Sequence, residues 1–588
     1  MQKTDSSQEN LSKFNRDFLD SENRASFIGT GSLGGKAQGL CLIDNLLTST
    51  FEAEAFPQID VNVPTFTVIR TDVFDAFMQR NDLYEIALSG ATDDRIAHAF
   101  QKASLPMEIV GDLRGLISRV HRPLAVRSSS LLEDAMFEPF AGIYGTKMTP
   151  NNQPDIDSRF RKLVEAIIYV YASTFFKAAR DYMKATSHSV EDEKMAVIIQ
   201  EVVGQRHDDR FYPELSGVGR SFNFYPMGPA RPENGVVNLA LGLGKTIVDG
   251  GVSWAYSPAF PRVKPPYGSL SDMLKQTQTD FWAVNMGQPP DWDPVHETEY
   301  LLECNITVAE KDATLRHLAS TYDRESDRLT IGIGNYGPRV LTFGPLLQID
   351  LIPLNALVKQ LLALCETRLE NPVEIEFAMT FDEETPAGKR HRFSFLQVRP
   401  MVVSTEEIEI TEEEMTAHEN LAVSEHTLGN GTLDVIHDVI YVKPELFKPE
   451  HSPRISLELE ALNKKLLAEE RPYLLIGFGR WGSSDPWLGI PVNWGQISGA
   501  RSIIEATQEN INVELSQGSH FFHNLTSFNV SYFSMPLTGK YKIDWEWLDQ
   551  KTAVEEMEFV RLVRLNSPLQ IKVDGRSGQG IIRKSDES

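Results

Sequence analysis

Cysteine is scarce in this sequence. Among 588 residues only Cys41, Cys304 and Cys365 occur, and no two of them form a C-x-x-C pair. That scarcity excludes a disulfide scaffold and a cysteine-rich zinc site, and it fits a reducing compartment. Long apolar runs are missing as well. Because no stretch of 18 apolar residues occurs, we expect no segment that spans a membrane.

Positive charge is also in short supply, with 57 Lys and Arg against 82 Asp and Glu and a net charge of −25. An acidic surface repels phosphate backbones, which argues against a general nucleic-acid-binding protein. Residues 1–25 are polar and acidic and lack the apolar core of a signal peptide. We therefore expect a mobile leader on a soluble, cytoplasmic protein, and the length predicts three to five domains.

The patterning divides the rest of the chain into two folded units. Apolar runs alternate with helical periodicity over residues 26–403, whereas the stretch 252–340 is rich in proline, tryptophan and polar residues and is interpreted as an insertion. Residues 404–420 hold seven Glu and no Lys or Arg, which is typical of an exposed connector or a solvated helix face. Residues 421–588 form the second unit. Within the first unit we predict strands over residues 61–69, 123–127 and 196–203 and two more near 373–403. We predict helices over residues 72–80, 157–185 and 354–369.

Three glycine motifs imitate nucleotide-binding fingerprints and fail their own patterns. GIGNYG (332–337) is followed by Pro338 and a strand-like run, although a dinucleotide fingerprint needs a helix there. GLGKT (242–246) has Leu239 where a Walker A loop needs glycine, and GSLGGKA (31–37) lacks both the first glycine and the hydroxyl residue. We therefore exclude a P-loop nucleoside triphosphatase.

Two cations fall at places suited to binding an anion. Lys36 follows a glycine-rich turn near the start of a helix, where backbone N–H groups and the helix dipole favour negative charge. Arg127 ends the apolar run of PLAVRSSS (123–130) and precedes Glu133 and Asp134. Each has a simpler alternative: Lys36 as a solvated side chain, and Arg127 as half of a structural ion pair with one of those carboxylates.

A predicted hairpin carries paired polar side chains. Strand alternation points Glu374 and Glu376 to one face, and the returning strand brings Gln397 and Arg399 to a common face as well. One carboxylate and one amide oxygen suit Mg²⁺, and an arginine beside them would neutralise phosphates. The alternative is the polar face of an edge hairpin. The loop FAGIYGT (140–146) is suited to closing over a ligand, or is simply a surface turn.

Taken in order, these segments resemble the N-terminal nucleotide-binding region of phosphoenolpyruvate synthase and pyruvate, phosphate dikinase. The likeness covers residues 27–403 apart from 252–340, and it runs through GGKAQGL, VPTFTV, PLAVRSSSLLED, FAGIYGT, AVIIQEVV, LSGVGRSFNFYP, LGLGKTIVDGGV, VEIEFA and FLQVRPM. The resemblance implies an α+β fold with two ATP-grasp lobes that clamp ATP, followed here by a smaller α/β C-terminal domain.

The resemblance also implies ATP and Mg²⁺ as cofactors. Lys36, Arg127 and Arg399 would contact the phosphates and act as catalytic residues, and Glu376 and Gln397 would hold Mg²⁺. The remaining ATP contacts that it implies, in the lid and in the hinge strand beside adenine, are Ala141, Gly142, Gln200, Glu201 and Val203.

The activity implied is an ATP- and Mg²⁺-dependent phosphotransferase, whose acceptor is a small molecule or a separate carrier protein. The alternative is a catalytically reduced, nucleotide-binding regulatory or scaffold protein. Neither nucleic acid nor a membrane is an expected partner.

Three features depart from the family pattern. Lys245 stands where the family usually has Glu, and this reverses a charge beside the nucleotide. The 185 residues after position 403 are too few for a barrel of about 250 residues. The family's histidine motif on a swivelling acceptor domain is incomplete. His520, in SQGSHFFHNL (516–525), is the candidate phosphoacceptor, and a histidine satisfied by its helix start is the alternative.

The C-terminal unit has a signature of its own, GRWGSSDPW (479–487). Its polar side chains, between Trp481 and Trp487, could bind a polar or anionic substrate. A tryptophan-packed structural loop is the alternative. The polar residues concerned are Arg480, Ser483, Ser484 and Asp485.

Overall fold

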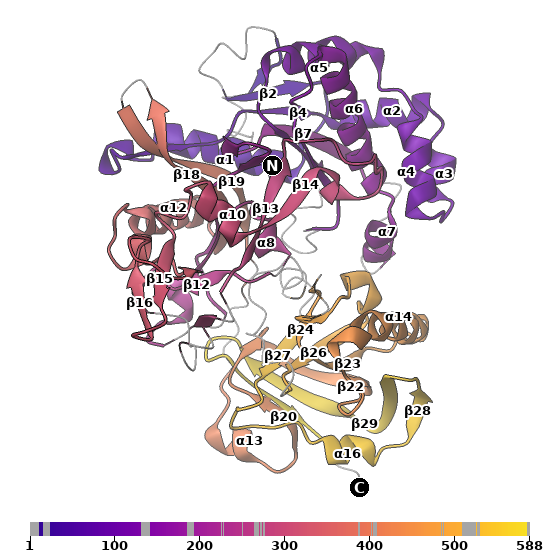
Figure 1. Cartoon of the computed structure of the whole chain (residues 1–588). Coiled ribbons are helices and arrows are strands. Elements are labelled where there is room, and N and C mark those ends of the chain that lie inside the picture. The colour runs from indigo at the N-terminus through magenta and orange to yellow at the C-terminus, as the bar shows by residue number, and fades with distance from the viewer. Residues whose placement is uncertain are drawn as a thin grey trace.

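The computed structural model describes most of the 588 residues. The residues outside the description are 1–10, 16–23, 131–141, 185–192, 225, 227, 250, 264–269, 271–272, 275–276, 386–387, 402, 404–407, 484, 486, 509–524, 526–529 and 585–588. Helices and strands mix along the described chain and build several separate sheets, so the fold is a mixed α/β structure (Figure 1).

The first sheet has six described strands in the order β1-β2-β4-β7-β5-β6. They are β1 (Ser12–Lys13), β2 (Ala25–Ile28), β4 (Phe66–Ile69), β7 (Met195–Glu201), β5 (Leu124–Ser130) and β6 (Thr146–Thr149). The helices of this part of the chain are α1 (Gly35–Ser49), α2 (Thr71–Arg80), α3 (Tyr84–Leu88), α4 (Asp93–Gln101), α5 (Met107–Arg119), α6 (Ile156–Ser173) and α7 (Lys177–Lys184).

The second sheet has six described strands in the order β12-β11-β10-β18-β19-β3. They are β12 (Trp254–Tyr256), β11 (Val236–Ala240), β10 (Leu215–Arg220), β18 (Val373–Thr385), β19 (Gly388–Pro400) and β3 (Ile59–Asn62). The short helix α8 (Lys245–Val248) follows β11, and α12 (Leu354–Leu369), which spans the predicted helix, precedes β18.

The stretch interpreted as an insertion is integrated into the sheets. β12 pairs with β11 in the second sheet, and β13 pairs with β9 in a four-stranded sheet of order β14-β13-β9-β8. The further elements are β8 (Gln205–His207), β9 (Arg210–Tyr212), β13 (Asp280–Asn285), η5 (Glu297–Tyr300), β14 (Leu301–Asn305), α10 (Ile306–Lys311), β15 (Ala319–Asp323), β16 (Arg328–Ile331), β17 (Arg339–Leu341) and α11 (Gly344–Leu347). GIGNYG thus connects β16 to β17 and leads into no helix, so it is not a dinucleotide-binding fingerprint.

A nine-stranded sheet follows, built from β20 (Asn420–Ser424), β21 (Thr427–Leu428), β22 (Gly431–Val442), β23 (Tyr473–Phe478), β26 (Ala500–Ala506), β27 (Ser531–Met535), β28 (Ala553–Glu556), β29 (Val560–Asp574) and β30 (Gln579–Arg583). α14 (Ser452–Ala468) connects the parallel strands β22 and β23. The short elements beside this sheet are α13 (Glu412–Thr416), α16 (Trp545–Asp549), β24 (Arg480–Trp481), β25 (Gly489–Ile490) and η7 (Trp494–Gln496).

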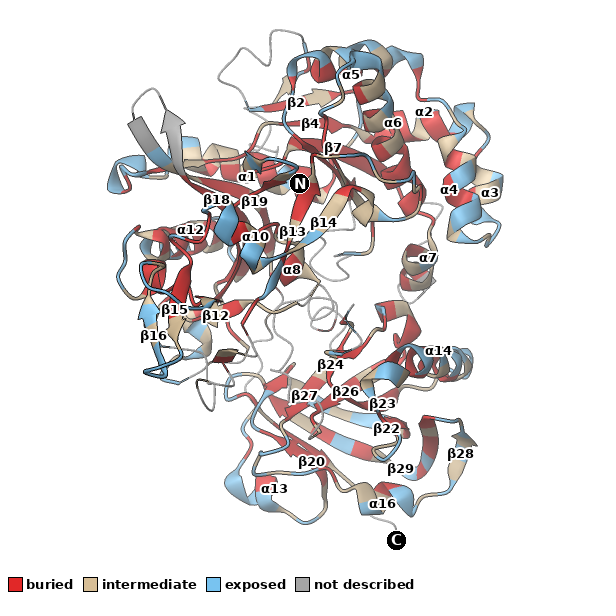
Figure 2. Cartoon of the chain, in the orientation of Figure 1, coloured by how far each residue is buried: buried red, intermediate tan, exposed pale blue. Residues whose placement is uncertain are grey.

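Burial explains why the central strands read as continuous apolar runs. All four residues of β4 are buried, and so are the first six of β7, because helices or sheets cover both faces (Figure 2). The acidic stretch is not wholly solvated, since Ile410 and Met415 within it are buried against Val423 and Ile581.

Two predicted elements are wrong in extent. The strand predicted over 61–69 is two strands in different sheets, because Pro64 has no N–H to continue a ladder: β3 runs parallel to β19, and β4 runs parallel to β2. The helix predicted over 157–185 breaks after Ser173, where α6 ends and α7 begins four residues later.

Glu460 makes one of the contacts between the C-terminal part of the chain and the helices of the first sheet. Glu460 on α14 accepts hydrogen bonds from Lys177 on α7 (2.8 Å) and from Gln496 on η7 (3.0 Å). It also pairs with Lys464 on its own helix (2.8 Å). This carboxylate therefore joins three elements that lie far apart in the sequence.

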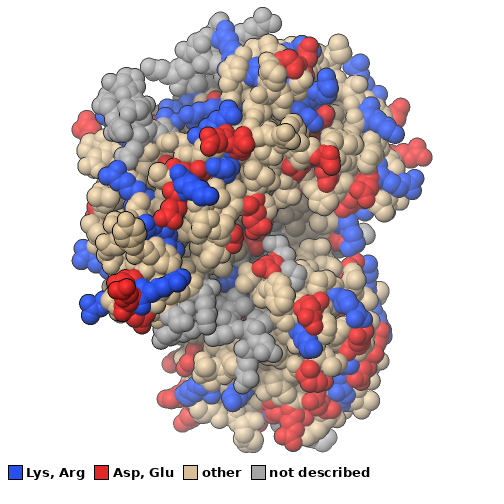
Figure 3. All heavy atoms as spheres, viewed as in Figure 1, with Lys and Arg blue, Asp and Glu red and all other residues tan. Residues whose placement is uncertain are grey.

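On the face that Figure 3 shows, basic and acidic side chains are interspersed, and a hollow lies between the upper part of the molecule and the C-terminal sheet. Among the described residues, no helix combines the length and the apolar character that crossing a membrane demands.

Candidate functional site

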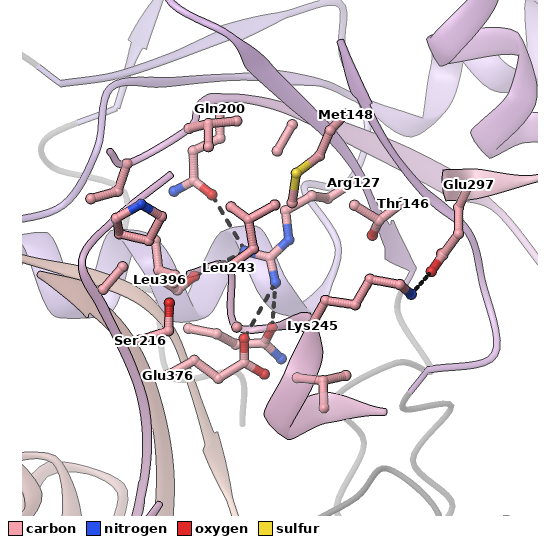
Figure 4. Close-up of a pocket in the computed structure, with 18 of the residues that line it drawn as sticks. Arg127, Thr146, Met148, Gln200, Ser216, Leu243, Lys245, Glu297, Glu376 and Leu396 are labelled. Atoms are coloured by element: carbon pink, nitrogen blue, oxygen red, sulfur yellow. Dashed lines mark hydrogen bonds and ion pairs between the residues drawn. The ribbon is translucent and has the colours of Figure 1, made fainter. Parts of the chain in front are cut away.

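A cavity of about 240 Å³ lies between the first and second sheets (Figure 4). Its walls come from β5, β6 and β7 of one sheet and from β10, β18 and β19 of the other. Eight of the residues predicted to contact ATP or Mg²⁺ line it together: Lys36, Arg127, Gly142, Gln200, Glu201, Val203, Glu376 and Gln397. Arg399 does not line it, and Ala141 and His520 lie outside the described residues.

Arg127 occupies the centre of the site and bridges the two sheets. Its Nη2 donates to Gln397 Oε1 at 2.8 Å, and its Nη1 donates to the Leu396 carbonyl at 3.1 Å and to Gln200 Oε1 at 3.3 Å. Glu376 Oε2 lies 3.8 Å from Nη2. The planar fork of a guanidinium suits this spread of acceptors and would equally suit phosphate oxygens. The alternative partners Glu133 and Asp134 lie outside the described residues.

Gln200 presents a donor that no described residue uses. Because Arg127 can only donate, the Gln200 amide must turn its oxygen toward Arg127, and its Nε2 is left without a hydrogen-bond partner within the described chain. The side chain is only 2% exposed and lines the cavity. A buried, unused donor is costly, so this amide is suited to an acceptor supplied by a ligand.

The predicted hairpin of β18 and β19 is confirmed, and its register sets the polar pairs. Glu376 lies opposite Gln397, and Glu374 lies opposite Arg399. The first pair lines the cavity, whereas Glu374 is bound by Arg399 and, through Oε2, by Arg220 Nε at 2.6 Å. Arg399 is 5% exposed, so the structure shows it in a buried ion pair, two positions further along the hairpin than the Glu376–Gln397 pair of the cavity wall.

The glycine-rich turn before α1 fits tightly against β5. Gly34 has φ +75°, and a Cβ there would come within 1.7 Å of the Ser129 carbonyl oxygen, so only glycine fits. The Ala37 N–H donates to Ser129 Oγ at 3.1 Å. Lys36 Nζ donates to Ser128 Oγ at 3.2 Å and lines the cavity while only 8% exposed. The solvated alternative for Lys36 is therefore wrong.

Carboxylates suitable for Mg²⁺ are few around the cavity. Within the described ranges, no three His, Cys, Asp or Glu side chains converge so as to hold a metal by themselves. Glu376 and Gln397 offer one carboxylate and one amide oxygen on the same wall. That donor set fits a hard ion which keeps water and phosphate ligands, as Mg²⁺ does.

Lys245 lines the cavity and is neutralised by two carboxylates. Its Nζ lies 2.6 Å from Glu297 Oε1 and 2.8 Å from Asp249 Oδ2. Burial lowers the pKa of Lys245, but the charges of Glu297 and Asp249 outweigh it and the net pKa is raised. Burial also raises the pKa of Asp249, and it raises that of Glu201 on the same cavity. Sequence reasoning named Lys245 and missed Glu297, which comes from the segment interpreted as an insertion.

The signature GRWGSSDPW does not form a slot between two tryptophans. Trp481 is 1% exposed, and its Nε1 donates to the Ile504 carbonyl at 3.2 Å, so it packs in the core. Trp487 is 68% exposed. Ser483 Oγ accepts from the Asp485 N–H at 3.2 Å, which closes the turn on itself, and Ser484 lies outside the described residues. For Trp481 the packing interpretation is confirmed.

Comparisons with known proteins identify the family to which most of the chain is similar. The sequence model of the family described as "Pyruvate phosphate dikinase, AMP/ATP-binding domain" matches residues 30–420. The "Uncharacterized phosphotransferase YvkC" of Bacillus subtilis (strain 168) is 22% identical over 196 residues, which are 32% of this chain. The match covers 20% of that protein, so the chain spans about one fifth of the length of this relative.

Proposed function

Because the chain belongs to the pyruvate phosphate dikinase AMP/ATP-binding family, we propose that it binds Mg·ATP in the cavity between the first two sheets and transfers a phosphoryl group from it. The observation that carries this proposal is the convergence of Lys36, Arg127, Glu376 and Gln397 on one cavity, from α1, β5, β18 and β19. Phosphoryl transfer depends mainly on positioning and on neutralising charge, and these side chains offer both.

The apolar and charged residues lie in different parts of the cavity wall, and this would orient a bound nucleotide. Apolar residues line one part of the cavity and would hold the base: Ala125, Met148, Val202, Val203, Leu243, Leu301 and Ala378. Along one face of β18, Ala378 is followed by Glu376 and then by Glu374, each step being two residues. Two strand residues span about 6.6 Å. The triphosphate would therefore run from the base slot past Glu376 toward the Glu374–Arg399 pair.

Each charged residue has a role in this arrangement. Lys36 and Arg127 would bind phosphate oxygens, Arg127 by exchanging part of its hydrogen bonding to Gln397 and Leu396. Glu376 and Gln397 would hold Mg²⁺, whose charge neutralises the phosphates during transfer. Arg399 would meet the terminal phosphates, and the loop at Gly142 would cover them.

The first two sheets would act as the two lobes of an ATP-grasp clamp over residues 26–403. Residues 404–420 would then connect them to a C-terminal accessory domain, 421–588, which selects or carries the acceptor. We propose a cytoplasmic enzyme, which suits three cysteines that are all unpaired. The acceptor would be a small molecule or a separate carrier protein, or His520 within this chain.

Incubation of the full chain with β- or γ-labelled ATP and Mg²⁺ tests the proposal. Transfer predicts Mg²⁺-dependent turnover, or acid-labile, base-stable label on the protein, and the H520A variant tells whether that label sits on His520. ATP binding with neither labelling nor hydrolysis, even with added cell metabolites and carrier proteins, would instead favour a regulatory nucleotide-binding protein. Failure to bind ATP at all would overturn both functions.

A further inference from the structure

The Lys245 cluster carries more negative than positive charge. One ammonium faces two carboxylates, and each carboxylate uses one oxygen on it, Glu297 Oε1 and Asp249 Oδ2. The other two oxygens, Glu297 Oε2 and Asp249 Oδ1, make no hydrogen bond to any described residue. Both side chains line the cavity and stay partly exposed, at 40% and 33%. The cluster therefore offers acceptors, and no free cation, to a ligand.

The chain around Glu297 is fastened to the neighbouring strand β6 by a buried lysine. Lys147, the residue between the cavity-lining Thr146 and Met148, is buried and pairs with Glu299. Its Nζ also donates to the carbonyls of Asp293 (2.7 Å) and His296 (3.0 Å). Three contacts on the chain around residue 297 thus fasten η5 to β6, and from η5 the Glu297 side chain reaches Lys245 at the cavity wall (Figure 4).

The cluster adjoins the apolar slot on two sides. Leu243 and Lys245 both line the cavity from the β11–α8 turn, and Leu301 and Glu297 both line it from η5 and β14. Each element thus contributes one apolar wall residue and one charged residue. In a nucleotide, the group attached directly to the base is the sugar, and its hydroxyl groups are hydrogen-bond donors. Carboxylate oxygens are their natural acceptors.

We propose that Glu297 and Asp249, both oriented by their ion pairs with Lys245, bind the sugar hydroxyl groups and select ribonucleotides over deoxyribonucleotides. This inference rests on the proposed ATP binding and adds a specificity to it. A second observation in the same cavity also points to a nucleotide-sized ligand: the unused Nε2 donor of the buried Gln200. The reversal of charge at position 245 is thereby compensated, because the segment 297–301 returns a carboxylate to the site.

Calorimetric titration of the full chain with Mg·ADP, Mg·2′-deoxy-ADP and Mg·3′-deoxy-ADP tests the inference, since ADP has no γ-phosphate to transfer. A hydrogen bond to a charged acceptor predicts that the wild type binds ADP at least about ten-fold more tightly than one of the deoxy forms. In E297Q or D249N that ratio falls to about three or less. The matched control E303Q, an exposed glutamate on β14 outside the cavity, keeps the wild-type ratio.

The ratio of ADP affinity to deoxy-ADP affinity distinguishes loss of the sugar contact from general damage to the binding site. A variant that loses only the sugar contact keeps its affinity for the deoxynucleotide, and D249N provides a second test should E297Q disturb η5. Equal binding of ADP and both deoxy forms by the wild type would overturn the inference and leave ATP binding standing. The same holds if both variants weaken ADP and deoxy-ADP by one factor. No binding of ADP or ATP by the wild type would overturn the proposed function and this inference together.

Discussion

Arg127 and Gln397 are 270 positions apart in the sequence, yet Arg127 Nη2 donates to Gln397 Oε1 at 2.8 Å. The bond joins β5 of the first sheet to β19 of the second, across the cavity that both sheets line. A ligand placed there meets groups from both sheets at once.

Replacing Arg127 should abolish nucleotide binding. R127A removes the fork that reaches Gln397, Leu396 and Gln200, and we expect the Kd for Mg·ATP to rise at least about a hundred-fold. R127K should recover little, because one ammonium nitrogen cannot replace the two separate nitrogens with which the planar guanidinium reaches its acceptors. Calorimetry measures the affinity. R114A, which removes a half-exposed arginine on α5, is the control, and binding by R127A at the strength of R114A would contradict the prediction.

Gly34 and Gly90 form a matched pair for a test of the glycine turn. Both have positive φ, +75° and +73°, but a Cβ at Gly34 meets the Ser129 carbonyl at 1.7 Å, whereas one at Gly90 meets nothing within 4 Å. G90A should cost only the backbone strain of about 1–2 kcal/mol. G34A should cost clearly more and should weaken ATP binding, because α1 and Lys36 must shift. Urea denaturation and calorimetry measure both effects, and equal losses in the two variants would be inconsistent with the tight fit.

The buried pair Glu374–Arg399 predicts an unequal outcome for its two members. E374A leaves Arg399 and Arg220, which are 5% and 8% exposed, without their shared carboxylate and should cost about 3–5 kcal/mol. R399A leaves Glu374 still paired with Arg220, so it should cost less stability. R399A should nevertheless abolish ATP-dependent phosphorylation. Undiminished turnover in a folded R399A protein would remove Arg399 from the proposed site.

The contact of Glu460 with α7 should depend on pH at the acid end. Burial alone would raise the pKa of Glu460, but hydrogen bonds from Lys177, Lys464 and Gln496 lower it to about 2. The unfolded value is higher, near 4.5. The stabilisation is therefore complete above that value and is lost as the pH falls toward about 2.

The unfolding free energies of wild type and E460Q should accordingly differ by a constant amount around neutral pH, and the difference should shrink as the pH falls below about 4.5. Denaturant titrations at several pH values measure it. E445Q, at an exposed position before α14, should show no such trend. A difference that grows on acidification would reverse the sign argued here.

Local alternation was enough to place some site residues from the sequence. Glu376 and Gln397 lie on one face because strand side chains have a period of two, and the short connection of β18 to β19 makes the strands antiparallel neighbours. Lys36 followed from the glycine turn before α1. That Arg127 meets Gln397 is a tertiary fact, and no periodicity within β5 encodes it.

Glu297 could not be found from the sequence for a related reason. It lies 52 positions after Lys245, and the pairing of β13 with β9 and β14, together with the contacts of Lys147 on β6, brings it to the cavity. Pro64 was the signal that could have divided the strand predicted over 61–69. Trp481 and Trp487 look alike in sequence, and only packing separates the buried one from the exposed one.

Lys147 limits how this protein can be recombined with its relatives. Its buried ammonium depends on Glu299 and on two carbonyls between residues 293 and 296. A chimera that grafted β6 into another family member without residues 293–299 would leave that buried ammonium without these three acceptors. Fragment swaps should therefore move the two segments together, although Lys147 and Asp293 are 146 positions apart in the sequence.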